Sequence, residues 1–129
     1  RSERVVYCDG KADRSTGKEL QVYGDANLLT LALINLIRNA LQAVEGQEDG
    51  VVRVDTCAGA TGHLLIIITD NGPGIPPERL SAIFTPFFST KSGGSGIGLP
   101  ISQRIMQLHG GQLSVSSIPN VRTEFRMEF

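Results

Sequence analysis

Two glycine-rich segments carry residues whose types and spacing suit ligand chemistry. Residues 70–75 read Asp-Asn-Gly-Pro-Gly-Ile directly after an apolar run, and residues 93–99 read Gly-Gly-Ser-Gly-Ile-Gly-Leu. A carboxylate accepts hydrogen bonds, and glycines leave the backbone bare enough for a flat ligand to approach. Backbone N–H groups at the start of a helix bind phosphate. The two segments together predict one nucleotide pocket, and ATP is the nucleotide that we expect there.

A pair of asparagines, Asn35 and Asn39, adds a candidate metal site. They are four residues apart in a segment with helical periodicity, so their amides lie on one helix face about 6 Å apart. An amide oxygen is a neutral, hard ligand, and Mg2+ held by a triphosphate takes few protein ligands. Taken alone, the pair is more typical of solvated or capping asparagines. Beside the glycine-rich segments, we interpret it as a ligand for Mg2+ and phosphate.

The glycines match neither of two common phosphate-binding motifs. A P-loop has lysine directly after its last glycine, whereas Lys91 precedes the glycines in this chain. The spacing Gly94-x-Gly96-x-Gly98 also differs from a dinucleotide-binding fingerprint, which requires a βαβ unit. What remains is an ordered set: paired asparagines on a helix, Asp-x-Gly-x-Gly after a strand, a Phe-rich segment, and Gly-x-Gly-x-Gly leading into a helix.

Length, charge and cysteine usage bound the class of protein. The 129 residues, 40% of them hydrophobic, suffice for one domain with its own core. The net charge of −1 comes without a basic stripe, which argues against nucleic acid as a partner. Cys8 and Cys57 lack metal-ligand spacing, so we expect reduced thiols in a reducing compartment. With neither a signal peptide nor an apolar run of about 20 residues, the chain is expected to be cytoplasmic.

The first third of the chain predicts a hairpin followed by a helix. Residues 1–24 are expected to form an N-terminal hairpin, with strands over 4–9 and 20–23. Asp25 is expected to cap a helix that stops at Gly46. The apolar residues of this helix recur at helical spacing: Leu29, Leu33, Leu36, Ile37, Ala40 and Val44.

The middle of the chain predicts two strands around a glycine-rich turn at 59–62. These strands cover 51–58 and 63–70, and the second is apolar throughout, as a central strand is. Asp70 lies at the end of this second strand. Residues 76–83 open with two prolines and predict a short helix.

The last third predicts a loop, a helix and two strands. Residues 84–95 lack a clear period and indicate a mobile loop, and 99–109 form a helix that stops at two glycines. The apolar residues of this helix are at 101, 105 and 108. Strands follow over 113–117 and 123–129. The sum is an α+β fold: a two-layer α/β sandwich, in which about three helices cover one face of a mixed, largely antiparallel sheet.

The ordered set of motifs resembles the ATP-binding catalytic domain of sensor histidine kinases, within the GHKL superfamily. The resemblance covers residues 25–129, and the sequence of residues 39–43 favours the nitrogen-regulation type of kinase. By this resemblance Asn39 is the Mg2+ ligand, and Asn35 assists at the metal and the phosphates. Asp70 matches the carboxylate that accepts a hydrogen bond from the adenine amino group.

The same resemblance assigns the remaining site residues. Gly72, Gly74 and Ile75 match the turn under the base, and Thr123 the residue that approaches adenine. Phe87 belongs to the phenylalanine motif, for which core packing is the plain alternative. Lys91 is similar to family lysines that reach the γ-phosphate, and a solvated lysine is the plain alternative there. The lid hinge and triphosphate cradle are matched by Gly94, Ser95, Gly96, Ile97, Gly98 and Leu99.

Position 35 separates kinases from hydrolases within the superfamily. Hydrolysing members carry there a glutamate that activates water, whereas this chain has an amide, which cannot take a proton at neutral pH. The catalytic set for phosphoryl transfer is then Asn35, Asn39 and Lys91. His109 is expected to cap a helix end and His63 to lie on the surface, so the phosphoacceptor histidine is expected outside this chain.

The resemblance implies a function and partners. ATP and Mg2+ are the expected cofactors, and the γ-phosphoryl group is expected to pass to a histidine on a separate dimerisation domain of the same parent protein. A response regulator follows downstream; the fragment is expected to be monomeric and its parent homodimeric, either cytoplasmic or anchored in the inner membrane. Two departures, Gln42 and Arg122, imply rearranged phosphate and adenine contacts. An anti-sigma-type serine kinase and a non-catalytic ATP-sensing domain remain as alternatives.

Overall fold

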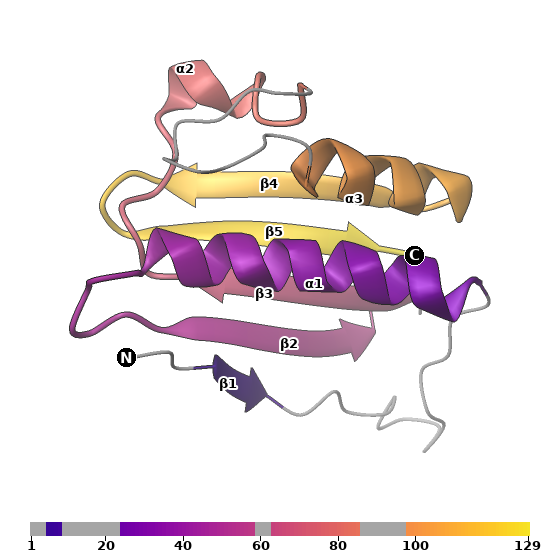
Figure 1. The fold of residues 1–129 in the computed structure, drawn as a ribbon, viewed down its shortest axis with the longest axis horizontal. Helices are drawn as coiled ribbons and strands as arrows, with labels where there is room; N and C mark the ends of the chain where they lie inside the picture. The colour runs from indigo at the N-terminus through magenta and orange to yellow at the C-terminus, as the bar shows by residue number, and fades with distance from the viewer. Residues whose placement is uncertain (1–4, 9–23, 59–62, 86–97) are drawn as a thin grey trace.

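One five-stranded sheet organises the chain, and helices cover one of its faces (Figure 1). The structure is a computed structural model that describes residues 5–8, 24–58, 63–85 and 98–129. The elements in chain order are β1 (Val5–Cys8), α1 (Ala26–Ala43), β2 (Val52–Ala58), β3 (Leu64–Asp70), α2 (Pro77–Leu80), α3 (Gly98–Leu108), β4 (Gln112–Ile118) and β5 (Arg122–Glu128).

The strands are ordered β1-β2-β3-β5-β4, so the apolar strand β3 lies in the middle, as predicted. β1 pairs with β2 in parallel, and the other neighbours are antiparallel. This confirms a mixed, largely antiparallel sheet in an α+β fold. α1 packs over β3 and β2, and α3 packs beside α1 and over β4. In Figure 1 the short helix α2 lies beyond the β4 edge, so among the helices of the described residues α1 and α3 cover the sheet face.

Asp25 begins α1 by the predicted cap. Its Oδ1 accepts hydrogen bonds from the backbone N–H groups of Asn27 and Leu28, at 2.9 and 3.1 Å, which satisfies two donors of the first turn. The helix ends at Ala43, and Gly46 then adopts a φ of +80° that turns the chain toward β2. The cap and the stop therefore lie where the sequence indicates them.

The buried face of α1 differs in detail from the predicted stripe. Leu36, Ala40 and Val44 are buried as expected, but Leu29, Leu33 and Ile37 are only partly buried. Ala32, which the apolar spacing did not single out, is 0% exposed. It lies where α1 meets α3, because the buried Ser102 hydroxyl donates to the Ala32 carbonyl oxygen at 3.1 Å. Small residues allow this close approach of the two helices.

The apolar residues that indicated α3 do not all face the core. Ile101 is 37% exposed and Leu108 is 60% exposed, while Ile105 is buried. The inward side consists of Ser102, Ile105 and Met106. The small Ser102 faces inward because α1 approaches closely there, where the Ser102 hydroxyl donates to the Ala32 carbonyl oxygen.

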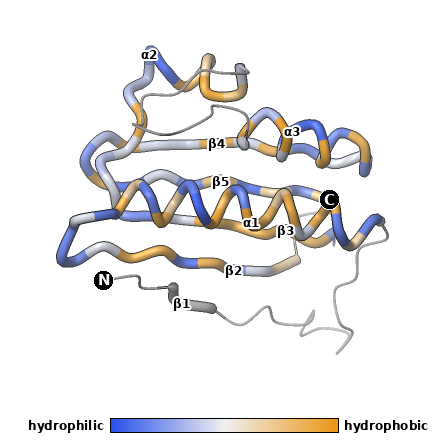
Figure 2. The backbone as a smooth tube through the Cα atoms, viewed as in Figure 1, coloured by the Kyte–Doolittle hydropathy of each residue, from blue (hydrophilic) through white to orange (hydrophobic). Residues whose placement is uncertain are grey.

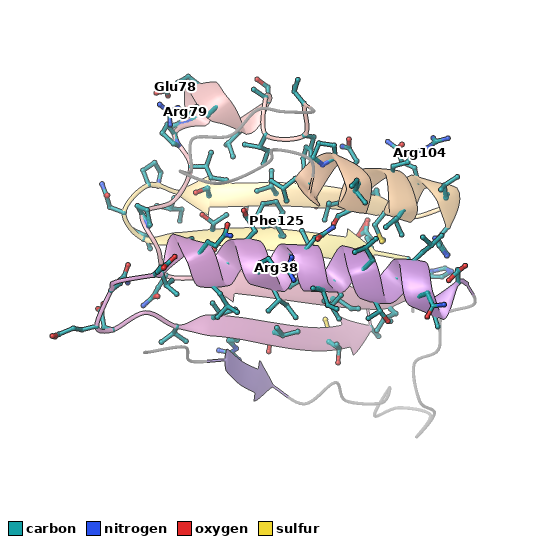
Figure 3. The ribbon with its side chains drawn as sticks, in the orientation of Figure 1. Arg38, Glu78, Arg79, Arg104 and Phe125 are labelled. Carbon is teal, nitrogen blue, oxygen red and sulfur yellow. The ribbon has the colours of Figure 1, made fainter. Side chains whose placement is uncertain are left out.

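The two faces of the sheet differ in character. Hydrophobic residues colour much of α1 and of the strands (Figure 2), and those of α1, β2, β3 and β5 pack into one core. Phe125 of β5, labelled in Figure 3, is 1% exposed there. On the opposite face of β5, Arg126 donates to Glu124 at 2.7 Å, and this contact raises the pKa of Arg126. Arg38 and Arg104 lie on the exposed sides of α1 and α3 (Figure 3).

One predicted element needs correction, and two others fall outside the description. The helix expected through residue 83 ends at Leu80, and the chain continues in turns whose hydrogen bonds span three residues, such as Thr85 N–H to Ala82 O at 2.9 Å. One helical turn after two prolines gains too few hydrogen bonds to propagate. The strand expected at 20–23 and the turn at 59–62 lie outside the described residues.

Candidate functional site

Three polar side chains form a row across three strands at one end of the sheet. Asp70 of β3 is the register partner of Thr123 of β5, which is the partner of Ser117 of β4. Directly opposed residues of antiparallel strands share a face, with Cβ atoms about 4.5–5.5 Å apart. Two residues further along each strand, this face carries apolar side chains such as Ile68 and Phe125. The polar row therefore closes the apolar core on the helix-covered side.

Asp70 and Thr123 are the buried part of this row. Asp70 is 2% exposed and Thr123 is 4% exposed. Asp70 Oδ1 accepts a hydrogen bond from the Gly72 N–H at 2.9 Å, which folds the chain back under the carboxylate. A ligand atom that reaches either group is shielded from water, where each hydrogen bond contributes more than at the surface.

Close backbone approach requires glycine at positions 72 and 74. A Cβ on Gly72 would lie 2.8 Å from the carbonyl oxygen of Ala43 at the end of α1. Gly74 has a φ of +77°, and a Cβ there would lie 2.9 Å from the Ile118 carbonyl oxygen. The predicted bare turn is therefore present. It is wedged between the end of α1 and the β4–β5 turn.

Ser117 is a site component that the sequence reasoning missed. Its Oγ accepts from the Ile75 N–H at 2.7 Å, donates to the Arg122 carbonyl oxygen at 3.0 Å, and lies 3.2 Å from Thr123 Oγ1. The Asn120 N–H adds a bond to the Pro73 carbonyl oxygen at 2.6 Å. The alternation of β4 placed Ser117 on the helix-covered face, and that was the signal available in the sequence.

Asn71, inside the same motif, points away from the polar row and anchors the loop after α1. Its Oδ1 accepts from the Val51 N–H at 2.7 Å, and its Nδ2 donates to the Asp49 carbonyl oxygen at 2.8 Å. The Gln47 side chain donates to the Asn71 carbonyl oxygen at 2.9 Å. The turn after Asp70 is thereby fixed to the start of β2.

The predicted asparagine pair lies on a stripe of α1 that borders the buried face. Asn35, Asn39 and Ala43 follow at intervals of four residues, and all three are partly buried. Asn35 Nδ2 donates to the Gly98 carbonyl oxygen at 3.4 Å, at the first residue of α3. At the other end of the stripe, Ala43 contacts Gly72. The stripe therefore runs from the start of α3 to the turn below Asp70.

The donor chemistry of this stripe fits Mg2+. The side chains offered by Asn35 and Asn39 have neutral amide oxygens, which are hard ligands that leave most coordination positions to phosphate oxygens and water. Both residues are only partly buried, which suits an ion whose coordination a phosphate group would share. Within residues 24–58, 63–85 and 98–129, no group of three or more His, Cys, Asp or Glu side chains could hold a metal ion.

The described part of the chain contains nine of the predicted site residues. It places Asp70, Gly72, Gly74, Ile75 and Thr123 at one end of the sheet, and Asn35, Gly98 and Leu99 at the start of α3, with Asn39 between them along α1. The other predicted residues lie outside the description: Phe87, Lys91, Gly94, Ser95, Gly96 and Ile97. Most of the expected loop at 84–95 lies there too, although Phe84 packs against the core.

Neither histidine stands at this site. His63 is exposed, as expected. His109 follows α3, where its Nδ1 bonds the Ile105 carbonyl oxygen at 2.8 Å and its Nε2 accepts from the Asp25 N–H at 3.0 Å. Because the carbonyl can only accept and the N–H can only donate, Nδ1 donates to Ile105 and Nε2 accepts from Asp25. His109 therefore joins two helix ends, a structural role in line with the predicted cap.

Comparison with known proteins identifies this arrangement. Residues 24–129 match the family model described as histidine kinase-, DNA gyrase B- and HSP90-like ATPase. The chain belongs to this ATPase family. The match begins one residue before the cap of α1 and includes both ends of the site, so the predicted resemblance is confirmed.

Within this ATPase family, several similar curated proteins are sensor kinases. The chain is 42% identical to the sensor histidine kinase ZraS of Salmonella typhimurium over 98 residues, which cover 76% of this chain and 21% of ZraS. It is 38% identical to the sensory histidine kinase/phosphatase NtrB of Vibrio alginolyticus, over 95% of this chain and 37% of NtrB. The chain thus spans between a fifth and two fifths of these relatives, and it corresponds to their ATPase domain.

Solved structures agree with this assignment. The mycobacterial sensor histidine kinase MprB superposes with a TM-score of 0.74 at 27% identity, covering 98% of this chain and 82% of MprB. Full-length ShkA in complex with AMPPNP superposes with a TM-score of 0.78 at 25% identity, covering 97% of this chain and 25% of ShkA. The histidine kinase type of ATPase domain, predicted from the motifs, is therefore the fold found here. Among the described residues, no helix has both the length and the apolar character of a membrane span.

Proposed function

We propose that this chain is the ATP-binding catalytic domain of a two-component sensor histidine kinase, and that it passes the ATP γ-phosphoryl group to a histidine on a dimerisation domain of the same parent protein. A response regulator receives the group downstream. The domain itself is monomeric, its parent is homodimeric, and the reaction takes place in the cytoplasm, with or without a membrane anchor elsewhere in the parent.

One observation carries this proposal: a single stripe of α1 connects the buried polar end of the sheet, beside Gly72, to the start of α3. Asp70 and Thr123, both buried, offer hydrogen-bond acceptors at the first end. Asn35 meets the start of α3 at the second end, and the backbone N–H groups at a helix start attract phosphate. Adenine at the first end and the triphosphate at the second match a nucleotide in both chemistry and direction.

The site residues then have distinct tasks. Asp70 accepts from the adenine amino group, and Gly72, Gly74 and Ile75 form the turn along the base. Asn39 holds Mg2+ with help from Asn35, and the bound ion neutralises charge on the phosphates. Gly98 and Leu99 at the start of α3 belong to the phosphate cradle. We assign Lys91 and residues 94–97 to the same cradle. Phosphoryl transfer of this kind depends on positioning and electrostatic stabilisation.

The amide at position 35 favours transfer over hydrolysis. A general base that activates water must accept a proton, and the Asn35 side chain donates to Gly98 O and does not titrate at neutral pH. ATP is thereby kept for a nucleophile that is itself basic, as histidine is. We therefore expect binding without turnover in the domain alone.

The test combines ATP binding with phosphotransfer in trans. The purified domain should bind Mg-ATP, hydrolyse it slowly and not label itself. It should phosphorylate the dimerisation domain of its parent when that domain is added. Acid-labile label on a histidine supports the proposal. Brisk ATP hydrolysis by the domain alone would overturn it, and acid-stable phosphoserine on a protein partner would indicate the anti-sigma type of kinase.

A further inference from the structure

We propose that Ser117 is a positioning residue that sets the direction of the Thr123 hydroxyl and thereby selects a base with an amino group. This inference rests on the proposed function, since it requires a nucleotide base at Asp70. It concerns a residue on β4, one strand beyond the Asp70–Thr123 pair.

Counting hydrogens around Ser117 fixes the direction of each bond. A serine hydroxyl has one hydrogen and two lone pairs. The Arg122 carbonyl oxygen, 3.0 Å away, can only accept, so it takes the hydrogen of Ser117. The Ile75 N–H, at 2.7 Å, can only donate, so it occupies one lone pair. The contact of 3.2 Å to Thr123 Oγ1 then has one solution, in which Thr123 donates to the second lone pair of Ser117.

This solution leaves Thr123 with acceptor capacity only. Its hydrogen is committed to Ser117, and both lone pairs of Oγ1 remain for other groups. The carboxylate of Asp70, its register partner, likewise accepts. Two neighbouring acceptors suit the two hydrogens of an amino group or of a bridging water molecule, and they repel a carbonyl oxygen at the same place.

Burial makes this arrangement selective. Asp70 and Thr123 are 2% and 4% exposed, so a carbonyl oxygen held against them could not recover its lost hydrogen bond from water. Without the Ser117 oxygen, the Thr123 hydroxyl is free to rotate and can donate to such a carbonyl. Ser117 therefore acts on discrimination between bases through Thr123, without touching the base.

The experiment compares ATP with ITP, in which a carbonyl replaces the amino group of the base. Their dissociation constants are measured by calorimetry on the intact domain, its Ser117→Ala variant and a Ser116→Ala control. Ser116 lies on the same strand, exposed on the other face. We expect the intact domain to prefer ATP, so that its dissociation constant for ITP exceeds that for ATP. In Ser117→Ala the ratio of the ITP constant to the ATP constant should fall by about tenfold, which corresponds to about 1.4 kcal/mol. Ser116→Ala should leave the ratio unchanged.

Two further variants separate orientation from folding. Thr123→Val removes the hydroxyl and should lower the ratio by itself; adding Ser117→Ala should then lower it no further. If Ser117→Ala does not fold, Ser117→Cys retains a weak acceptor of similar size, and its ratio should lie between those of the intact domain and Thr123→Val. An equal loss of ATP and ITP affinity in the Ser117 variants would overturn the inference alone. A folded, intact domain that binds no ATP would overturn the proposed function as well.

Discussion

The Nε2 atom of His109 accepts a hydrogen bond from the backbone N–H of Asp25, and Gly24 lies directly against the imidazole ring. This contact joins the end of α3 to the residue that caps α1. A Cβ on Gly24 would lie 2.6 Å from His109 Nε2 and closer still to Cδ2. Other residues readily adopt the φ of Gly24, so the backbone does not require glycine at this position. The imidazole ring requires it, because a side chain would collide with the ring.

We therefore expect Gly24→Ala to destabilise the domain by about 1–3 kcal/mol, as overpacking does. His109→Ala should also destabilise it, through the loss of two hydrogen bonds. The double variant should be more stable than the sum of the two losses predicts, since the methyl group then occupies space vacated by the ring. Urea unfolding of all four proteins measures this coupling. Strict additivity would show that the ring is not what excludes a side chain at position 24.

A second prediction concerns the role of Asn39 as a metal ligand. Asn39→Ala should weaken binding of Mg-ATP by about tenfold or more while changing binding of metal-free ATP little, since only the metal-dependent part of the affinity is lost. Asn27→Ala is the matched control, because Asn27 is an exposed asparagine in the first turn of the same helix. Titrations with Mg2+ at fixed ATP read out the difference. The metal-ligand role fails if both variants retain the metal dependence of the intact domain.

The third prediction concerns Asp70 and the choice of nucleotide. Asp70→Asn keeps an oxygen for the Gly72 N–H and introduces an NH2 group that can donate to a carbonyl. The preference for ATP over GTP should therefore fall by about tenfold or more. Asp49→Asn, which changes an exposed carboxylate in the loop after α1, serves as the control. Competition binding with the two nucleotides measures the ratio. Equal preferences for ATP over GTP in the two variants would show that Asp70 does not recognise the base.

The fourth prediction addresses the anchor at Asn71. Asn71→Ala removes the hydrogen bonds to Val51 N–H and Asp49 O, at a cost of about 2 kcal/mol in the free energy of unfolding. Asn71→Asp should cost at least as much, because a carboxylate oxygen then faces the Asp49 carbonyl oxygen. Thermal and urea unfolding test both variants. Full stability in Asn71→Asp would show that the amide group is not required as a donor.

Sequence reasoning predicted the parts of the fold that depend on local chemistry. The cap at Asp25, the apolar strand β3 and the glycines after Asp70 all follow from residue type and spacing within a few positions. These features recur wherever such residues do, and a motif-level resemblance to a known family added the assignment of ligand and metal.

Contacts between distant segments were beyond the reach of the same reasoning. The role of Ser117 depends on the register of β4 against β5 and on the return of the chain at Ile75. Ala32 and Ser102 are buried because two helices cross there, 70 residues apart in sequence. Periodicity assigned α3 its helix but not its inward side, since a helix with aliphatic residues on several sides leaves the choice to its neighbours.

The stripe of Asn35, Asn39 and Ala43 fixes the distance between the two ends of the site through the length of α1. Asn35 and Ala43 are separated by about 12 Å along the helix axis, at 1.5 Å per residue, and each end is in contact with a different part of the site. Inserting one residue between them would rotate one contact by about 100° relative to the other and shift it by about 1.5 Å. The number of residues in this helix is thus as strictly constrained as the identity of its asparagines. Changes of chain length compatible with nucleotide binding belong elsewhere, in segments outside α1.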